Sequence, residues 1–430
     1  MYFVTLSPLA LYRKTMRILI IGLGGITANF HNWPERTLGQ ALFAAGHEVH
    51  AIGYYQPAQP HLGLNKREEQ IDGVHVMRVK PEFFPSGQLL TALRTTERID
   101  VVHVFHPRNV LAYQAVRWLK SHGVPVVWTW NGPFHDRWLV DDRERPFEAP
   151  PHPEKLIDTP AKLFKRLLRE PLAARDHLRN YGIHAPMRSV DAFIPCSQHE
   201  ADVLREIGFG DVPMTVIPQW LDMAYMDGPA SPLDSALTEP IIPYIGQLTV
   251  RKCYDMVVEA MPQVIARFPT ASFVFVTHNP EQQATLQRLA AERGVAANLH
   301  FFGSISEQQK LALLRASAAL PVPSRYEGFG LPLLEGMASG TPVISTNIPV
   351  INEIVRDGEN GLLVPYDDSA ALAQALVRVL EDNELCDRLI AGGKRTISER
   401  FDPATLAAQV VAVYNEVIER RKRSSRKTAE

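Results

Sequence analysis

The sequence predicts an α/β protein built from two doubly wound domains, and three observations support this prediction. First, the chain has 430 residues, which is long for a single hydrophobic core. Second, from Met16 onward, short runs rich in Val and Ile alternate with helical stretches, which is typical of parallel sheets buried on both faces. Third, this alternation stops between Gly228 and Pro240, a stretch that we interpret as a linker, and then starts again.

The expected elements follow the chain in a similar order in both domains. The first domain is expected at 16–232, with a helix at 37–45 and strands at 17–21, 48–54, 74–79, 101–105, 124–130, 192–195 and 215–217. The second is expected at 238–402, with strands at 241–245, 273–276, 299–302, 320–322, 343–345 and 362–364. The carboxyl ends of both sheets are expected to meet at a central crevice. A long helix is expected at 403–420, and disordered ends at 1–15 and 421–430.

Composition argues against several classes of protein. The formal net charge is −2 and 46% of the residues are hydrophobic, so nothing global favours a nucleic-acid partner. The three cysteines, Cys196, Cys253 and Cys386, lie far apart, and this sparse, odd set favours a reducing cytoplasm over a disulfide framework. No apolar run reaches the roughly 18 to 20 residues that a transmembrane helix needs. We therefore expect a cytoplasmic protein.

One stretch, residues 318–346, carries the strongest functional signal. A short apolar run ends at Pro323, and a glycine-containing turn at 327–330 then precedes a helical stretch. Glycines ahead of a helix let the backbone approach a ligand, and the first turn of a helix presents unpaired N–H groups to an anion. Glu327 begins the turn and Glu335 follows about two helical turns later. Two carboxylates at the end of a parallel strand suit the hydroxyl groups of a sugar or a ribose.

The complete pattern of this stretch resembles a known site. It consists of Glu327, then Gly328, Phe329, Gly330, Leu331 and Pro332, then Glu335 after seven intervening residues, then Ala-Ser-Gly-Thr-Pro-Val-Ile at 338–344. This pattern resembles the nucleotide-sugar site of the retaining GT-B glycosyltransferases of family 4 (glycosyl transferases group 1). The resemblance extends over residues 16–401 and is strongest in the second domain.

The resemblance implies an architecture and roles for the residues of the pattern. It implies two Rossmann-like domains in the GT-B arrangement, the second binding the nucleotide-sugar donor and the first the acceptor, with the helix at 403–420 crossing back onto the first. Glu327 and the backbone from Phe329 to Leu331 would hold the sugar, and Glu335 would bind the ribose. The helix beginning after Gly330, together with Lys252, would stabilise the leaving diphosphate.

Lys252 belongs to a second motif, at 244–255. A basic residue on a loop after the first strand of the second domain is well placed to neutralise a diphosphate. The segment resembles the family motif Gly-Arg-Leu, Lys-Gly and Asp, with Gln247 in place of the arginine and Cys253 in place of the second glycine. Arg251 either replaces the missing charge or points at solvent, and the sequence leaves both possibilities open.

The first domain carries weaker signals. One of its strands resembles a family strand with histidines at its end. A histidine inside an apolar strand is expected in the core, as for His103, so His106 is the predicted functional histidine. Asn131 stands where the family has a histidine near the donor sugar. An amide can bond a sugar hydroxyl but does not titrate near neutral pH. His135 is a candidate to compensate for that replacement.

The glycine-rich loop after the first strand allows two functional interpretations. A dinucleotide fingerprint needs a third glycine where Thr27 stands and an acidic residue at the end of the second strand, and the sequence has neither. The resemblance instead implies that Gly24 and Gly25 face the donor diphosphate and the acceptor. A tight strand-to-helix turn is the purely structural alternative.

Residues 133–189 match the family poorly and are rich in charge and proline. They contain a basic amphipathic segment at 161–169. This segment either contacts an anionic membrane or acceptor, or packs its apolar side on the first domain.

Together these signals predict a glycosyltransferase that moves a hexose from a UDP- or GDP-linked sugar to a hydroxyl acceptor with retention of anomeric configuration. The acceptor would be a saccharide, a lipid-linked saccharide or a small molecule. No Asp-x-Asp occurs in the chain, so we expect no catalytic metal, and the resemblance implies no cofactor. The alternatives are a nucleotide-sugar epimerase or sugar phosphorylase of the same fold, and a degenerate scaffold protein that binds without turnover.

Overall fold

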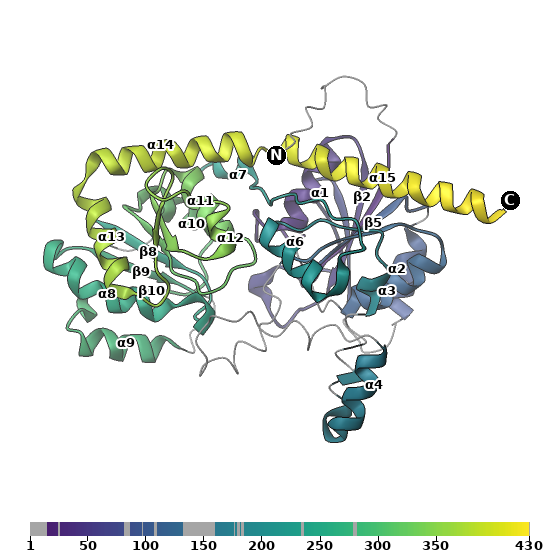
Figure 1. Cartoon of the computed structure of the whole chain (residues 1–430). Helices are drawn as coiled ribbons and strands as arrows, with labels where there is room; N and C mark the ends of the chain where they lie inside the picture. The colour runs from purple at the N-terminus through teal and green to yellow at the C-terminus, as the bar shows by residue number, and fades with distance from the viewer. Residues whose placement is uncertain are drawn as a thin grey trace.

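The structure is a computed structural model that describes residues 15–24, 26–80, 87–96, 98–106, 110–131, 160–175, 177–178, 181, 185–233, 236–277 and 282–429. Figure 1 shows two α/β halves side by side. The chain builds the N-terminal half first (purple to teal), then the C-terminal half (green), and a final long helix (yellow) returns to the N-terminal half.

The N-terminal half is built around a seven-stranded sheet within the described residues. The strand order is β3-β4-β2-β1-β5-β6-β7, with β1 Arg17–Ile21, β2 Glu48–Tyr54, β3 Glu68–Ile71, β4 Val74–Val79, β5 Val101–Phe105, β6 Val126–Thr129 and β7 Ala192–Phe193. The β3–β4 pair is antiparallel, and the others are parallel. The parallel strands follow the order of a doubly wound Rossmann-like sheet. Central β5 is buried along its whole length because helices cover both faces.

The C-terminal half repeats this arrangement. Its strands are β8 Ile241–Ile245, β9 Ser272–Val276, β10 Leu299–Phe302, β11 Leu320–Val322, β12 Val343–Thr346 and β13 Leu362–Val364. They form two parallel three-stranded groups, β10-β9-β8 and β11-β12-β13. A bridge between Ile241 and Ser317 joins the groups, and the Ala318 N–H donates to the Ile241 carbonyl at 2.9 Å. The predicted fold of two Rossmann-like domains in the GT-B arrangement is thus confirmed.

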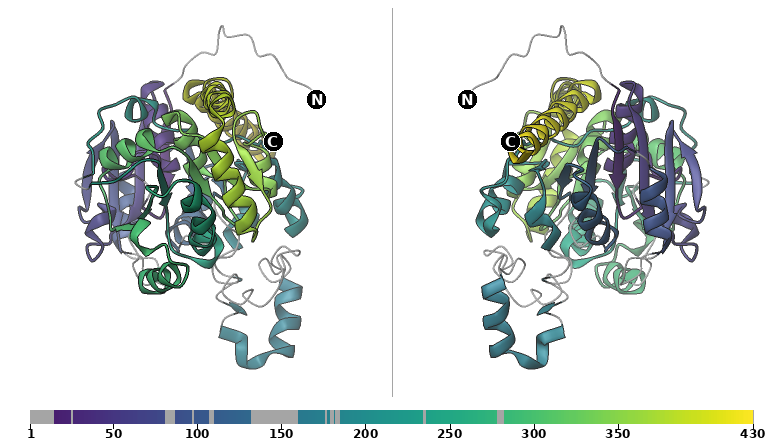
Figure 2. Two further views of the ribbon diagram at one scale, coloured as in Figure 1. Left: turned by 90° about the vertical axis from the view of Figure 1, so that its left-hand side faces the viewer. Right: turned by 90° about the vertical axis from the view of Figure 1, so that its right-hand side faces the viewer.

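Helices cover both sheets in the views of Figures 1 and 2. Those of the N-terminal half are α1 Pro34–Ala44, α2 Gly87–Thr95, α3 Val110–Ser121, α4 Pro160–Arg169, α6 Gln198–Leu204 and α7 Met223–Met226. Those that follow are α8 Tyr254–Arg267, α9 Gln283–Glu292, α10 Glu307–Ala316, α11 Leu331–Ser339, α12 Pro349–Asn352, α13 Ser369–Glu381, α14 Asn383–Arg400 and α15 Pro403–Ala429. Several begin at polar caps, such as the capping box of Ser306 and Gln309 at α10. Among the described helices, none is long and apolar enough to cross a membrane.

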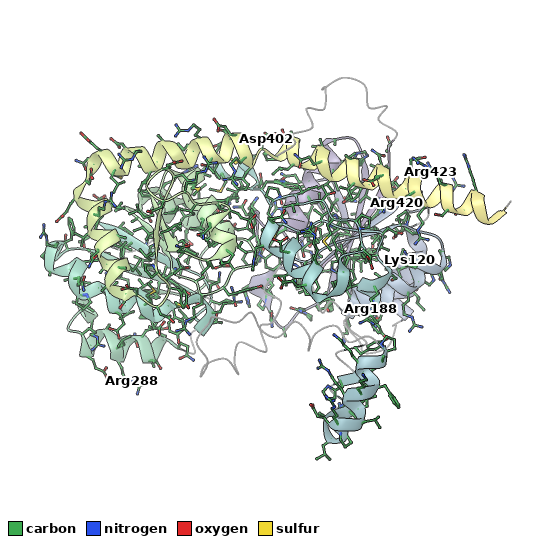
Figure 3. The ribbon with its side chains drawn as sticks, in the orientation of Figure 1. Lys120, Arg188, Arg288, Asp402, Arg420 and Arg423 are labelled. Atoms are coloured by element: carbon green, nitrogen blue, oxygen red, sulfur yellow. The ribbon has the colours of Figure 1, made fainter. Side chains whose placement is uncertain are left out.

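The last helix, α15, lies along the N-terminal half. Asp402 marks the bend between α14 and α15 in Figure 3, and Arg420 and Arg423 lie farther along α15. Arg421 Nε donates to Asp191 Oδ1 at 3.0 Å, which anchors the last turns of the helix beside β7. The expectation of a disordered end at 421–430 is therefore wrong for residues 421–429, because helix-forming residues and this anchor continue the helix to Ala429.

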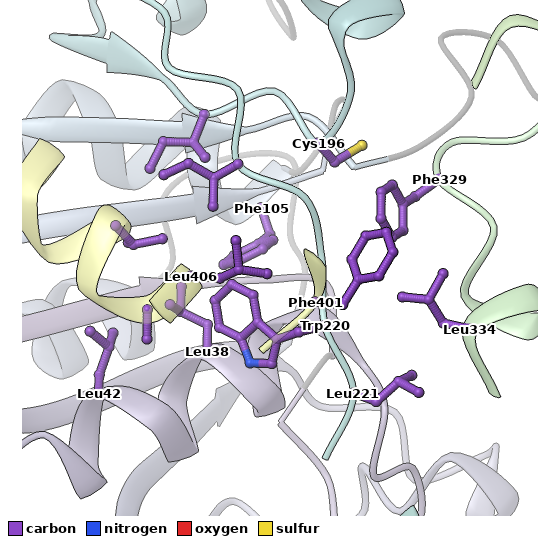
Figure 4. Close-up of a cluster of buried hydrophobic side chains, with 14 of the residues drawn as sticks. Leu38, Leu42, Phe105, Cys196, Trp220, Leu221, Phe329, Leu334, Phe401 and Leu406 are labelled. Carbon is purple, nitrogen blue, oxygen red and sulfur yellow. The ribbon is translucent and has the colours of Figure 1, made fainter. Parts of the chain in front are cut away.

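An apolar cluster joins the two halves. Figure 4 shows it with Leu38, Leu42, Phe105, Cys196, Trp220 and Leu221 from the N-terminal half, Phe329 and Leu334 from the C-terminal half, and Phe401 and Leu406 from the final helices. Polar contacts reinforce it, because the carboxylate of Glu353 accepts the backbone N–H groups of Gln198 at 2.7 Å and His199 at 2.8 Å. The halves therefore form a direct, largely apolar contact.

Two predictions about the first sheet were wrong. The strand predicted at 215–217 is extended chain that only bridges β7 through Met214, although Thr215 and Ile217 still donate N–H groups to Phe193 and Pro195. Strand β3 was missed because its sequence, Glu-Glu-Gln-Ile, is polar and exposed at the sheet edge. The helix predicted at 37–45 begins earlier, since Pro34 starts its first turn.

Candidate functional site

Glu327 lies buried in the loop after β11, where two cations converge on it. Lys252 ends a short 3-10 helix, Val250–Lys252, and donates its Nζ to Glu327 Oε1. Ser324 Oγ donates to the same oxygen at 2.5 Å, and Arg251 Nη1 lies 3.6 Å from Glu327 Oε2. The loops meet because β8 and β11 are neighbours and both run toward this edge of the sheet. We call these four residues the Glu327 cluster.

The Glu327 cluster carries two positive charges and one negative charge. Burial would raise the pKa of Glu327, but the charges of Lys252 and Arg251 and the hydrogen bonds from Lys252 and Ser324 hold it below its usual range. Glu327 is therefore ionised at neutral pH. The Arg251 side chain is only 14% exposed and its Nη1 also donates to the Tyr326 carbonyl at 3.1 Å, so it points at the cluster rather than at solvent.

Helix α11 begins directly after this loop. Its N-cap is Gly330, whose φ of +111° lies in the left-handed region that favours glycine. No side chain among the described residues caps this helix start. Phe329 is buried in the apolar cluster, which fixes the backbone immediately before Leu331, the first helical residue. The first-turn N–H groups and the positive end of the helix therefore point toward the loop that carries Glu327.

The two departures from the resembled motif differ in outcome. The side chain of Gln247 is exposed, and within the described chain no hydrogen bond joins it to the Glu327 cluster. Cys253 is the N-cap of α8 with φ of +43°, so it keeps the left-handed conformation in which the family has glycine. Its thiol is buried, and burial raises the pKa of Cys253 to about 12. Cys253 is thus a protonated packing residue at neutral pH.

Glu335 lies apart from the Glu327 cluster, at the contact between the halves. Its Oε1 accepts a hydrogen bond from Asn32 Nδ2 at 2.7 Å and another from Lys310 Nζ at 2.9 Å. Lys310 Nζ also lies 3.1 Å from Glu307 Oε1. Burial would lower the pKa of Lys310, but the charges of Glu335 and Glu307 raise it above its usual range. The ribose contact of Glu335 remains a prediction. It would form beside Lys310 of the same half and the Asn32 amide of the N-terminal half.

On the N-terminal side, His106 lies at the end of β5 in a buried polar cluster. Its Nε2 lies 2.8 Å from Glu35 Oε1, and its Nδ1 lies 3.0 Å from the Asn131 carbonyl. Gln219 Nε2 donates to Asn131 Oδ1. A carbonyl oxygen can only accept a hydrogen bond, so Nδ1 carries the proton that it donates to Asn131. Burial would lower the pKa of His106, but the charge and hydrogen bond of Glu35 raise it. We call these four residues the His106 cluster.

Cys196 and Glu200 connect the two clusters. The Cys196 N–H donates to Glu200 Oε2 at 2.6 Å, and its Sγ donates to the Gly328 carbonyl at 3.2 Å. The charge of Glu200 also acts on His106. Burial raises the pKa of Glu200 to about 7. The His106 cluster and the turn next to Glu327 are therefore neighbours across the contact between the halves.

The remaining positions that the sequence singles out are His103, His135 and the two glycines of the first loop. His103 is buried and bonds Tyr414 Oη at 2.6 Å and Thr129 Oγ1 at 2.8 Å, and burial lowers its pKa to about 3, so the prediction of a core histidine is confirmed. A Cβ on Gly24 would lie 2.7 Å from Leu64 Cδ1, so the turn is closely packed here, and the contact of Gly24 with the donor remains a prediction. Gly25 and His135 lie outside the described residues.

Replacing Glu35 should lower the pKa of His106. In Glu35→Gln, burial would be offset only by the smaller contributions of the Asn131 carbonyl and Glu200, so the pKa of His106 should fall. NMR titration of protein labelled at histidine ring carbons measures this directly. Because the folded pKa is raised in wild type, the stability from this pair is fully present below about pH 6.5 and is lost as pH rises through the folded value.

The control for this experiment is Glu48→Gln, which removes the carboxylate 2.9 Å from His50 on another part of the sheet. It should leave the His106 titration unchanged. An unchanged His106 titration in Glu35→Gln would contradict the proposed pairing.

The two halves match two family models. Residues 36–225 match Glycosyltransferase Family 4, and residues 231–396 match Glycosyl transferases group 1. Both halves are therefore glycosyltransferase domains. Residues 226–230, which neither model matches, begin at the last residue of α7 and precede β8.

Curated relatives resemble these glycosyltransferase domains to different extents. The chain is 34% identical over 168 residues to a phosphatidyl-myo-inositol mannosyltransferase of Mycobacterium leprae, a match that covers 39% of this chain and 44% of that protein. It is 29% identical over 427 residues to a glycogen synthase of Mycobacterium tuberculosis, which covers 93% of this chain and 94% of the relative. The mannosyltransferase match is thus partial, whereas the glycogen synthase match includes both glycosyltransferase domains.

Solved structures share the fold. A sucrose-phosphate synthase from Thermosynechococcus elongatus aligns with a TM-score of 0.69 at 21% identity, covering 94% of this chain and 99% of that one. HepE of Anabaena, in complex with UDP and glucose, aligns with a TM-score of 0.64 at 17% identity, covering 93% and 100%. At these identities the similarity shows that this protein and the two solved proteins share a fold.

Sequence reasoning missed several residues that the glycosyltransferase domains bring together. Glu35 had a usable signal, because it is the acidic residue in the first turn of the helix after the glycine-rich loop. A Cβ on Gly22 would lie 2.6 Å from Glu35 Oε1, so that glycine makes room for the carboxylate. No local signal predicts that Asn32 meets Glu335, since 303 positions separate them.

Proposed function

We propose that this protein transfers a hexose from a nucleoside-diphosphate sugar to a hydroxyl acceptor with retention of the anomeric configuration. The observation that carries this proposal is the Glu327 cluster, in which a buried, ionised carboxylate and two cations adjoin the start of an uncapped helix in the described structure. Cations and helix N–H groups suit a diphosphate, and the carboxylate suits sugar hydroxyls. The glycosyltransferase matches in both halves support the same reaction class.

In the proposed reaction, Lys252 and the first turn of α11 stabilise the charge that develops on the diphosphate as its bond to the sugar breaks. Arg251 adds a second positive charge, which Gln247 cannot supply. Glu327 and the backbone at 328–331 orient the hexose, and Glu335 binds the ribose. The acceptor hydroxyl attacks the same face of the sugar, and a phosphate oxygen takes its proton. This route needs no protein nucleophile.

The His106 cluster is proposed to act on the other side of the sugar. In the structure, both ring nitrogens of His106 are engaged by Glu35 and Asn131. We therefore assign His106 the role of positioning the turn at Asn131, which has φ of +47° and which the resemblance places near the donor sugar. This role differs from that of a general base, because both ring nitrogens already have partners within the protein.

The proposed donor is UDP- or GDP-linked, the former being suggested by the UDP complex of the structurally similar HepE. The acceptor, a saccharide, lipid-linked saccharide or small molecule, would bind the N-terminal half. Among the described residues, no three His, Cys, Asp or Glu side chains gather so that they could hold a metal ion. We propose metal-independent transfer, with Lys252, Arg251 and the helix countering the phosphate charge, and no cofactor. The proposed location is cytoplasmic.

The decisive experiment combines binding and product analysis. Calorimetry with UDP, GDP and ADP should show one nucleotide binding at micromolar strength. With the corresponding α-linked sugar nucleotide, an acceptor mixture and EDTA, NMR of the product should show an α-glycoside. A β-linked product would contradict retention, and loss of activity in EDTA with recovery on adding manganese would contradict metal independence. Free epimerised sugar nucleotide, phosphate-dependent cleavage, or binding without turnover would point to the epimerase, phosphorylase and scaffold alternatives, respectively.

A further inference from the structure

Large apolar side chains exposed to solvent are concentrated in one small segment of the described structure. Five such residues stand out, and four of them lie between 164 and 178, namely Phe164, Leu168, Leu172 and Leu178. Phe164 is 63% exposed, Leu168 68% and Leu172 fully exposed. Apolar residues scattered singly over a surface need no explanation, but a local group of this kind marks a site of interaction.

The segment has the geometry of a helix that lies at a polar–apolar boundary. In α4, Phe164 and Leu168 are one helical turn apart, and Leu163 and Leu167 lie beside them on the same arc. The basic residues fall on the opposite arc, at positions 162, 165, 166 and 169. The short 3-10 helix Pro171–Ala173 then places Leu172 at the end of this helix. One side of the segment is therefore apolar and the other is cationic.

Figures 1 and 2 show α4 projecting away from both sheets, on the opposite side of the N-terminal half from α15. Leu163 is the buried residue of this helix, whereas the side chains of Phe164 and Leu168 face outward. Of the two interpretations left open by the sequence, packing of the whole apolar side on the first domain is therefore wrong. The structure leaves Phe164 and Leu168 available to an external partner.

We propose that residues 160–178, which we call the docking segment, bind this protein to the surface of an anionic lipid bilayer. Charge selects this partner, because the sequence of the segment contains five Lys and Arg residues and only two acidic ones, and one of the two, Glu170, is paired with His177 at 3.0 Å. A bilayer surface offers both requirements at once, with anionic headgroups for the cations and an acyl boundary for Phe164, Leu168, Leu172 and Leu178.

This inference goes beyond the proposed function and does not depend on it. The docking segment belongs to the N-terminal half, whereas the Glu327 cluster belongs to the C-terminal half. Membrane binding and nucleotide binding can therefore be measured and lost separately.

The test is cosedimentation of the full-length protein with lipid vesicles. Vesicles of phosphatidylcholine containing about a quarter phosphatidylglycerol should retain the protein, and pure phosphatidylcholine should retain at least tenfold less, because the basic residues need anionic headgroups. Retention should also fall as salt is raised. Phe164→Ser/Leu168→Ser and Lys165→Glu/Arg169→Glu should each weaken binding tenfold or more, and both should unfold in urea at the same midpoint as wild type.

Matched controls separate the docking segment from general surface effects. Arg288→Glu/Arg395→Glu reverses two exposed charges on α9 and α14, and Figure 3 shows Arg288 far from α4. Phe43→Ser removes the fifth exposed apolar residue. Both controls should bind vesicles like wild type. Equal binding to both vesicle types, unchanged binding of the docking-segment variants, or a wild-type dimer that Phe164→Ser/Leu168→Ser dissociates would each overturn the proposal.

Discussion

Replacing Lys252 by Met should lower turnover roughly 10²–10³-fold, the typical loss when one positioned donor to a developing negative charge is removed. The same change should weaken nucleotide binding, since Lys252 supplies one of the two cations beside α11. It should also destabilise the fold by about 2–3 kcal/mol, because Glu327 is left buried with only Ser324 and the more distant Arg251 as partners. Urea unfolding and initial-rate assays measure the two effects.

A double variant separates folding from chemistry. In Lys252→Met/Glu327→Gln the buried charge is removed together with its partner, so most of the lost stability should return while turnover stays low. Lys394→Met, an exposed lysine on α14, serves as the control for removal of one charge. Wild-type turnover in Lys252→Met would exclude this residue from the reaction. Recovery of turnover in the double variant would show that the loss came from misfolding.

The second large effect concerns Glu200. Its pKa is raised to about 7 by burial, whereas in the unfolded chain it titrates near its usual 4.5. Between these two pH values, Glu200 is protonated in the folded protein and ionised in the unfolded chain. The free energy of unfolding therefore falls as pH rises from about 4.5 to 7 and levels off above pH 7. The integrated penalty is about 3 kcal/mol. Gln does not titrate, so Glu200→Gln should not show this loss of stability.

The measurement is urea unfolding of wild type and Glu200→Gln at pH 5 and pH 8, followed by tryptophan fluorescence. The free energy of unfolding of the variant relative to wild type should rise by about 2–3 kcal/mol between the two pH values, because part of the penalty is already present at pH 5. Glu384→Gln, which removes one exposed carboxylate at the start of α14, is the control. A difference between wild type and Glu200→Gln that is the same at both pH values would show that Glu200 is already ionised in the folded protein.

The sequence predicted those parts of the structure that depend on neighbouring residues. Gly330 could be recognised because only glycine readily adopts its backbone conformation before a helix, and the loops carrying Lys252 and Glu327 meet because they follow adjacent parallel strands. The direction of Arg251 could not be read, because it depends on the position of Glu327, 76 residues away in the sequence. Strand β3 escaped detection because an exposed edge strand lacks apolar periodicity.

The contacts between the halves could not be predicted from the sequence either, because they join residues that lie far apart along the chain. Asn32 meets Glu335, and Cys196 meets Gly328, only after both sheets have folded and packed through the apolar cluster of Figure 4. The strand pattern predicted that the carboxyl ends of both sheets meet, but it did not show that the Asn32 amide and Lys310 already bond Glu335 there.

The return of α15 also has a consequence for how the chain is made. The bond between His103 and Tyr414 joins residues 311 positions apart, and Leu406, Val410, Val413 and Val417 fill the core beside β1 and β5. The N-terminal half is synthesised first, but its hydrophobic core cannot be completed until α15 has been synthesised. During that interval the apolar residues that α15 covers stay exposed to solvent, while the C-terminal half can complete its own sheet. The N-terminal half is thus completed last, although it is synthesised first.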